Sequence, residues 1–372
     1  MQQSHKHHYV PEWYQRRFML PHQKSYFRLD IDPEIVKAPN GKTIKKGEVC
    51  TKGPGKYFYE SNLYTTVHFR EENDDIEKYL FGKIDTIGAK AIAAMVSKDW
   101  MRELHSNIEN YYEYMDAQRL RTPKGLIWLM QIHKPKSHNE LLYIMQYIRR
   151  MHCTMWAEAS MEIVTAHDSG VKFIVSDNPV TFYNHAFYPG NKACKFPYDP
   201  GIELKGTRTI FPLDLNHCAI LTHKEYARSP GKHKAQKHRT NARLFDDTII
   251  TYDDIIRERT FDEQQVSVIN YILKSRAQKY IAAAEKEWLY PEMVLRKRDW
   301  GAFDKLFVSG STKLFGRNVE IFVGGEDGRL IATQDEFGRK PKSRKEWIEK
   351  EQRMQWMEEH YKNLIAKKKF NE

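Results

Sequence analysis

The sequence has little cysteine and no long apolar run. Its four cysteines are spread along 372 residues and none forms a CxxC pair, so their spacing indicates neither a disulfide framework nor a zinc knuckle. Reduced thiols are typical of the cytoplasm, and we expect a cytoplasmic protein. No stretch of about 18 apolar residues exists, and the first residues have no apolar core, so we expect neither a membrane span nor a secretory signal.

The sequence also lacks the common catalytic fingerprints. It has no GxSxG motif, no phosphate-binding loop and no dinucleotide-binding glycine motif. A restriction-type nuclease would need an acidic residue followed by a strand that bears Glu-x-Lys, and Asp177 with Glu203-Leu204-Lys205 matches that pattern on paper. The triplet lies between two glycines with little strand character around it, so it is weak support for a nuclease.

What the sequence has in excess is positive charge. Lys and Arg number 60 against 49 Asp and Glu, which gives a net charge of +11. Basic surface attracts phosphate-bearing partners, so we expect a nucleic acid or a nucleotide. Residues 231–239 are basic without an apolar face, and form either a nucleic-acid contact loop or an ordinary solvated loop. The candidate contact residues in this stretch are Lys232, Lys234, Lys237 and Arg239.

Hydrophobic periodicity predicts an α+β fold that is mainly helical, with a small central sheet, mixed or antiparallel. Helices are expected at about 74–95, 107–121, 137–156, 260–288 and 343–369. Capping boxes are expected at Asp74 with Glu77, Ser137 with Glu140, Thr260 with Glu263, and Ser343 with Glu346. Hairpins are expected at 161–166 with 171–175, at 209–213 with 218–222, and at 319–333.

The stretch VKFIVSDNPVTFY, residues 171–183, contains the main candidate site. Its apolar part predicts a short buried strand that ends in the polar residues Ser176, Asp177 and Asn178. Asp177 has the chemistry of a general base or a metal ligand, and the Asn178 amide could orient a phosphate or a carbonyl. The alternative is that both side chains bond to nearby backbone and shape the turn before Pro179.

Two further residues are candidates for the same site. His8 is an acid, a base or a ligand in one interpretation, and a buried histidine bonded to backbone in the other. Arg121 either binds phosphate through two parallel hydrogen bonds or ties a helix end to a neighbouring carbonyl or carboxylate. The cofactor is unknown, and a divalent metal is compatible with Asp177. A shared site requires that His8, Arg121 and Asp177 lie close together.

Several motifs occur in the order found in a known family. They are His8-Tyr9-Val10-Pro11 with Tyr14, Arg17 and Phe18, then Leu63-Tyr64, Asp75-Ile76-Glu77, Arg121-Thr122-Pro123, Phe173 to Val180, and Phe211-Pro212-Leu213. With them the chain resembles a bacterial domain-of-unknown-function family, number four-two-three-eight, over about residues 5–290. The resemblance implies a fold neighbourhood and no particular reaction.

The chain is expected to divide near residue 291. Residues 1–290 would form the family core domain, and residues 291–372 an appendage made of a hairpin and an amphipathic helix. The apolar stripe of that helix should dock on the core or on a second copy of the chain, which would give a homodimer.

Two classes of function stay open. The leading hypothesis is an intracellular bacterial enzyme that acts on nucleic acid or nucleotide phosphates, a hydrolase such as a nuclease. The alternative is a non-catalytic module that binds nucleic acid or protein through its basic surface. Hydrolysis of DNA, RNA or nucleotides with Mg²⁺ or Mn²⁺ would separate the two.

Overall fold

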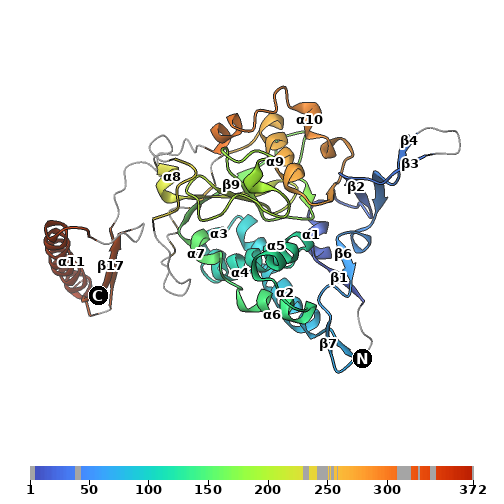
Figure 1. The fold of residues 1–372 in the computed structure, drawn as a ribbon. Coiled ribbons are helices and arrows are strands. Elements are labelled where there is room, and N and C mark those ends of the chain that lie inside the picture. Colours follow the sequence, from blue (N-terminus) through green and yellow to red (C-terminus); the bar gives the residue numbers. More distant parts are fainter. Residues whose placement is uncertain are drawn as a thin grey trace.

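The structure is a computed structural model that describes most of the chain. The described residues are 5–37, 43–228, 234–240, 250, 252, 255–257, 259–307, 320–325, 327–335 and 341–370. Within them the fold is α+β, as the sequence predicts, with a layer of helices packed against small sheets (Figure 1). Among the described helices, none is long and apolar enough to cross a membrane.

Two sheets form the centre of the molecule. The larger has the strand order β11 (Thr181–Tyr183), β12 (Arg208–Pro212), β13 (His217–His223), β9 (Ala159–Thr165) and β14 (Ile255–Ile256). Its neighbouring strands are antiparallel except β14, which runs parallel to β9. The smaller sheet is antiparallel and has the order β10 (Val175–Ser176), β15 (Tyr280–Ala283), β2 (Tyr26–Asp30) and β5 (Val49–Lys52). The predicted small sheet is thus present, in two parts.

The hairpin of β12 and β13 forms where the sequence predicts it. Both strands are almost wholly buried, as their apolar runs require. Asp214 makes the turn between them, because its Oδ1 accepts the backbone N–H groups of Asn216 and His217, each at 2.8 Å.

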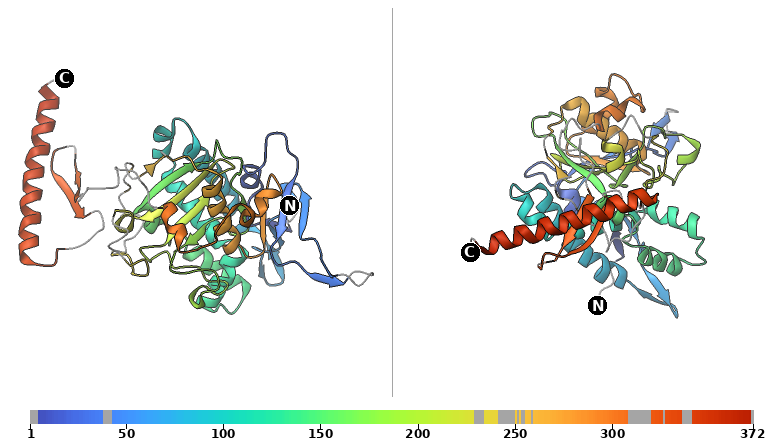
Figure 2. Two further views of the ribbon diagram at one scale, coloured as in Figure 1. Left: turned by 90° about the horizontal axis from the view of Figure 1, so that it is seen from above. Right: turned by 90° about the vertical axis from the view of Figure 1, so that its left-hand side faces the viewer.

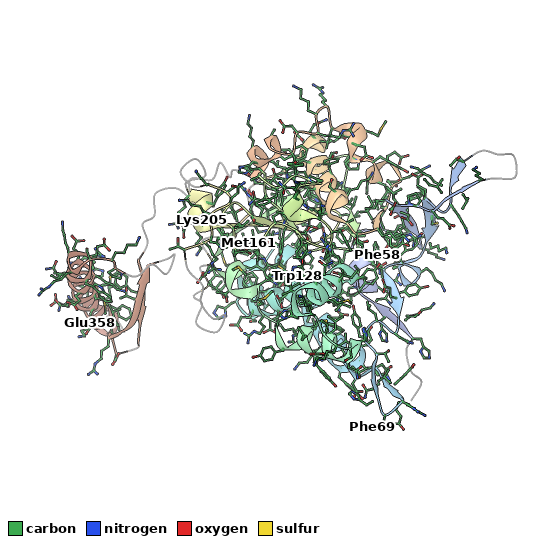
Figure 3. All side chains as sticks on the ribbon, viewed as in Figure 1. Phe58, Phe69, Trp128, Met161, Lys205 and Glu358 are labelled. Atoms are coloured by element: carbon green, nitrogen blue, oxygen red, sulfur yellow. The ribbon has the colours of Figure 1, made fainter. Side chains whose placement is uncertain are left out.

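Helix α4 (Ile108–Leu120) is the centre of the helical layer. Its tyrosines are buried, and one of them, Tyr114, packs on α2 (Gly82–Val96) at Gly88. A Cβ atom at Gly88 would lie 2.3 Å from the Tyr114 ring, so only glycine allows the two helices this approach. In Figure 3 the label Met161 marks β9 in the layer of sheets, and the label Trp128 marks the helix after α4 in the layer of helices.

Helix α5 (Pro123–His133) follows α4 after a sharp turn at the Arg121-Thr122-Pro123 motif. Pro123 occupies the first helical position, where its missing N–H is not needed. Thr122 is the N-cap, and its Oγ1 accepts the N–H of Gly125 at 3.1 Å. The motif therefore starts one helix directly after another and fixes the direction in which the side chains before it point.

The predicted hairpin of 161–166 with 171–175 is wrong. Strand β9 pairs with β13 and β14, whereas Val175 and Ser176 pair with β15 in the other sheet. The backbone between them crosses from one sheet to the other: Phe173 N–H bonds to the Leu215 carbonyl, at 3.0 Å. Phe173, Ile174 and Val175 of the apolar run are buried, as expected, but only Val175 belongs to a strand.

The predicted helix at 260–288 is too long. Helix α9 (Glu263–Arg276) ends before Ala277, and Tyr280 to Ala283 form β15. Its capping box is Asp262 with Gln265 and not Thr260 with Glu263. Apolar residues at 280, 281 and 284 fit a helical face and a buried strand equally well, so periodicity alone could not place the end.

Two other helix predictions are corrected in detail. The stretch 137–156 is divided into α6 (His138–Tyr147), capped by Ser137 as expected, and α7 (Cys153–Ala157). Asp116 accepts the backbone N–H groups of Arg150 and His152 between them, which stabilises the break. The helix expected to begin at Asp74 starts as a π-helical turn, Ile76–Phe81, without a side-chain cap.

The C-terminal elements form as predicted. Strands β16 (Glu320–Gly324) and β17 (Leu330–Asp335) make an antiparallel hairpin, and α11 (Arg344–Phe370) follows. Helix α11 packs on this hairpin, and Tyr361 lies over Gly324. Figure 2 shows α11 and the hairpin separated from the two central sheets. Residues up to Phe307 pack on the core, since Tyr183 donates a hydrogen bond to the Trp300 carbonyl at 2.7 Å. The expected division near residue 291 stays a prediction.

Candidate functional site

Asp177 directly follows β10 and is 3% exposed. Both oxygens of its carboxylate accept hydrogen bonds from backbone N–H groups. It accepts the N–H groups of Gln278, Lys279 and Tyr280 at 2.8, 2.6 and 2.7 Å. Burial raises the pKa of the carboxyl, and these three donors oppose the rise. The bonds are structural, but they differ from the predicted local turn before Pro179, since they join the end of α9 to the start of β15. A catalytic role for Asp177 stays a prediction.

Asn178 is fully buried and faces a different set of groups. Its Oδ1 accepts a hydrogen bond from Arg119 Nη1 at 2.5 Å, and its Nδ2 donates to the Arg276 carbonyl at 3.4 Å. Arg119 also forms an ion pair with Asp199, with 2.7 Å between Nη2 and Oδ2. The amide of Asn178 is therefore one wall of a buried charged cluster.

We call the group Arg119, Lys124, Asp199 and Arg276 the cationic centre. Lys124 Nζ lies 2.8 Å from Asp199 Oδ1 and donates to the Arg276 carbonyl, also at 2.8 Å. Burial alone would raise the pKa of Asp199, but Lys124 and Arg119 overcome it and lower that pKa to about 2. Asp199 is thus ionised at neutral pH, while burial lowers the pKa of Lys124 and Asp199 opposes that change.

Arg121 pairs with a residue that sequence analysis did not single out, Asp85, whose charge also acts on His8. Arg121 is fully buried, and its Nη2 lies 2.8 Å from Asp85 Oδ1. His8 ends β1 (Lys6–His8), and its Nε2 lies 3.8 Å from Glu12 Oε1. Burial lowers the pKa of His8, while Glu12, a backbone bond to Gly55 and the charge of Asp85 oppose the change. The imidazole is therefore neutral at pH 7.

Glu77, on the π-helical turn before α2, completes this second cluster. Burial raises the pKa of its carboxyl to about 7, with Arg121 opposing and Asp85 adding to the rise. We call His8, Glu77, Asp85 and Arg121 the acid–base cluster. Four of its buried atoms have no hydrogen-bond partner: His8 Nε2, Glu77 Oε2, Arg121 Nη1 and Asp85 Oδ1, the last of which contacts Arg121 only as an ion pair. The side chains of His8 and Asp85 are 18% and 24% exposed, so the cluster reaches solvent.

The two clusters lie on opposite sides of the end of α4. Arg119 and Arg121 are two residues apart, which separates their directions by about 200° around a helix. One guanidinium consequently bonds to Asn178 and the other contacts Asp85. The structure thus pairs Arg121 with Asp85, whose charge also acts on His8, and bonds Asn178 and Asp177 to other groups.

Sequence analysis missed most members of both clusters. Glu77 was expected to be a capping residue, and Asp85 was not considered. Asp199 stands in a loop of 24 residues, 184–207, and gave no signal of its own. Among the described residues, no group of three or more His, Cys, Asp or Glu side chains is arranged to hold a metal ion.

The basic stretch at 231–239 is partly described. Lys232 lies outside the described residues. Lys234 and Lys237 are exposed, and the Arg239 guanidinium pairs with Glu158. The backbone N–H of Arg239 bonds to the Glu203 carbonyl at 2.7 Å, which fastens this stretch to the loop that carries Glu203-Leu204-Lys205. Contact with nucleic acid through these residues stays a prediction.

Glu77→Gln is expected to change how stability depends on pH. The folded chain holds the Glu77 proton up to about pH 7, whereas the unfolded chain releases it near 4.5. Stability from this group is therefore complete below pH 4.5 and is lost as the pH rises to 7, by about 2 kcal/mol after allowance for partial exposure. Urea unfolding at both pH values should show this loss in the wild type and not in Glu77→Gln. The control, exposed Glu71→Gln, should behave as wild type.

Comparison with known proteins agrees with the resemblance that the motifs indicate. The structure defines an α+β protein with two polar clusters beside the end of α4. The model of the family described as "Protein of unknown function (DUF4238)" matches residues 6–287, and the chain belongs to this family. No curated protein and no solved structure matches the chain. The match includes every member of both clusters, and it confirms the resemblance without assigning an activity.

Proposed function

We propose that the chain is an enzyme that acts on nucleic acid or nucleotide phosphates, with the acid–base cluster as its reactive centre. The observation that carries the proposal is Glu77, a half-buried carboxyl whose pKa is raised to about 7 beside Arg121. A group that titrates near the working pH both gives and takes protons efficiently, and such perturbed groups concentrate at functional sites.

The members of the cluster would take complementary roles. Glu77 would transfer the proton, and neutral His8 would accept or relay it through the free Nε2. Arg121 Nη1 would donate to an anionic oxygen of the substrate. Mg²⁺ commonly binds proteins through one or two carboxylates together with substrate phosphates, and Glu77 and Asp85 supply two. The net charge of +11 also favours a phosphate-bearing substrate, and a hydrolase such as a nuclease is the form we propose.

A hydrolysis panel tests this proposal. DNA, RNA and nucleotides are incubated with the full chain and with Mg²⁺, Mn²⁺ or EDTA. For any substrate that is cleaved, Glu77→Gln should lower kcat/KM about 100-fold or more, the usual contribution of a general acid or base. Glu71→Gln should leave kcat/KM unchanged. Cleavage at the wild-type rate by Glu77→Gln, or no cleavage of any substrate, would contradict the proposal.

The alternative, a non-catalytic binding module, has its own supporting observation. Helix α11 leaves Trp347, Trp356 and Leu364 at least half exposed, beyond the face that packs on its hairpin. Such side chains favour contact with another surface, and we propose a second copy of the chain. Sedimentation should give a dimer mass for the full chain and a monomer mass for Trp356→Glu. A monomeric wild type would rule out the homodimer.

We also propose that the protein works in the cytoplasm. All four cysteines are free thiols and three of them are buried, which suits a reducing compartment. Fractionation of cells that produce the protein should place it with cytoplasmic markers, and recovery with membranes would count against this location.

A further inference from the structure

The cationic centre is buried, and its basic side chains outnumber its carboxylates. Arg119, Lys124 and Arg276 are 6%, 4% and 4% exposed. Asp199 pairs with the first two, at 2.7 and 2.8 Å. Asp177 also acts on Lys124 electrostatically, but three backbone N–H groups occupy its carboxylate. Three cations thus face two carboxylates, and a buried surplus of charge is costly unless something compensates it.

The partners that hold the Arg276 guanidinium are neutral. Its Nη2 donates to the Phe187 carbonyl at 2.6 Å, and a further hydrogen bond goes to the Cys194 thiol. The guanidinium carbon lies 5.0 Å from the centre of the Trp300 ring. Its Nε is buried without a hydrogen-bond partner. None of these partners is an anion, and the one carboxylate shown to interact with Arg276, Asp199, does so electrostatically and without a hydrogen bond.

One loop supplies Asp199 and covers the centre. The segment between β11 and β12 also supplies Phe187 and Cys194, which are the contacts of Arg276. Within 188–196, all of which the structure describes, Cys194 is the one buried residue. A segment with so little buried surface is held mainly by its polar contacts to the centre, and opening it is correspondingly easy.

We propose that Arg119, Lys124 and Arg276 form a binding site for a phosphate group, which Asp199 occupies while the loop is closed. The two oxygens of Asp199 each meet a different cation, as two oxygens of a phosphate would. A phosphate dianion supplies one more negative charge than Asp199 does, so it compensates the surplus better. On binding it displaces Asp199, gives Arg276 an anionic partner and releases the loop. This site is separate from the acid–base cluster, and the inference does not depend on the proposed enzymatic function.

The first test uses the wild-type chain and inorganic phosphate. Hydrogen exchange of residues 185–201 is measured in phosphate and in chloride of equal ionic strength. We expect exchange of this segment to become faster in phosphate, because Asp199 is displaced, while exchange of β12 and β13 is unchanged. Equal exchange of the segment in both salts, at phosphate concentrations up to tens of millimolar, would overturn the inference.

The second test removes the competing charge. Asp199→Asn keeps the shape of the side chain, and should bind inorganic phosphate at least tenfold more tightly than the wild type in calorimetry. Lys192→Gln, an exposed position in the same loop, should bind as the wild type does. Equal affinity in wild type and Asp199→Asn, or weakened binding in Lys192→Gln, would contradict the site. If Asp199→Asn does not fold, the hydrogen exchange of the wild type decides the question.

Discussion

Asp177→Ala is expected to lower the free energy of unfolding by about 4 kcal/mol. The change removes the acceptor of three backbone N–H groups that begin β15, in a place that water does not reach. Each buried donor left without a partner costs about 1–3 kcal/mol, and relaxation of the turn recovers part of the sum. Urea unfolding followed by circular dichroism measures the loss.

Two matched variants make this result specific. Asp177→Asn keeps one oxygen acceptor and should lose less than the alanine variant. Asp168→Ala removes a carboxylate from an exposed turn nine residues upstream and should change stability by less than about 0.5 kcal/mol. A loss below about 1 kcal/mol in Asp177→Ala would show that the three hydrogen bonds contribute little to stability. A catalytic role would then be the better explanation of Asp177.

Asp199→Asn is expected to cost about 3 kcal/mol at pH 7, because Arg119 and Lys124 stay buried without their anionic partner. This cost should depend on pH. The pKa of Asp199 is about 2 in the folded chain, against 3.8 normally, so its contribution is complete above pH 3.8 and is lost as the pH falls to 2. The shift corresponds to about 2 kcal/mol.

The measurement is the stability difference between wild type and Asp199→Asn at several pH values. It should stay constant from pH 7 to pH 5 and shrink by about 2 kcal/mol as the pH falls towards 2. An unchanged difference over the acid range would mean that Asp199 is not ionised by the cationic centre. Phosphate is left out of these buffers, since it is expected to bind the centre.

Local patterns predicted those parts of the fold that local interactions decide. The turn at Asp214 closes its hairpin through bonds within three residues, and the Ser343 cap starts α11 through a bond to the Glu346 N–H. The end of α9 depends instead on a distant residue. Asp177 takes the N–H groups that a continued helix would use, and that contact joins positions 100 residues apart.

The candidate site was predictable to a similar extent. The histidine of the first motif and the arginine of the middle motif were chosen from the sequence, and both interact with Asp85, Arg121 through an ion pair and His8 electrostatically. Asp85 and Glu77 could not be chosen, because an acidic residue on a helix usually faces solvent. Burial in the folded chain removes water from Glu77 and gives its carboxyl an unusual pKa.

The pKa of Glu77 in the folded chain is the most direct test of the central claim, that the acid–base cluster is a reactive centre. Difference infrared spectroscopy of wild type against Glu77→Gln isolates the carboxyl band of this residue and follows it with pH. The account predicts a titration at about pH 7, raised by burial from 4.5. A titration at or below 4.5 would show an ordinary surface carboxylate and would contradict the claim.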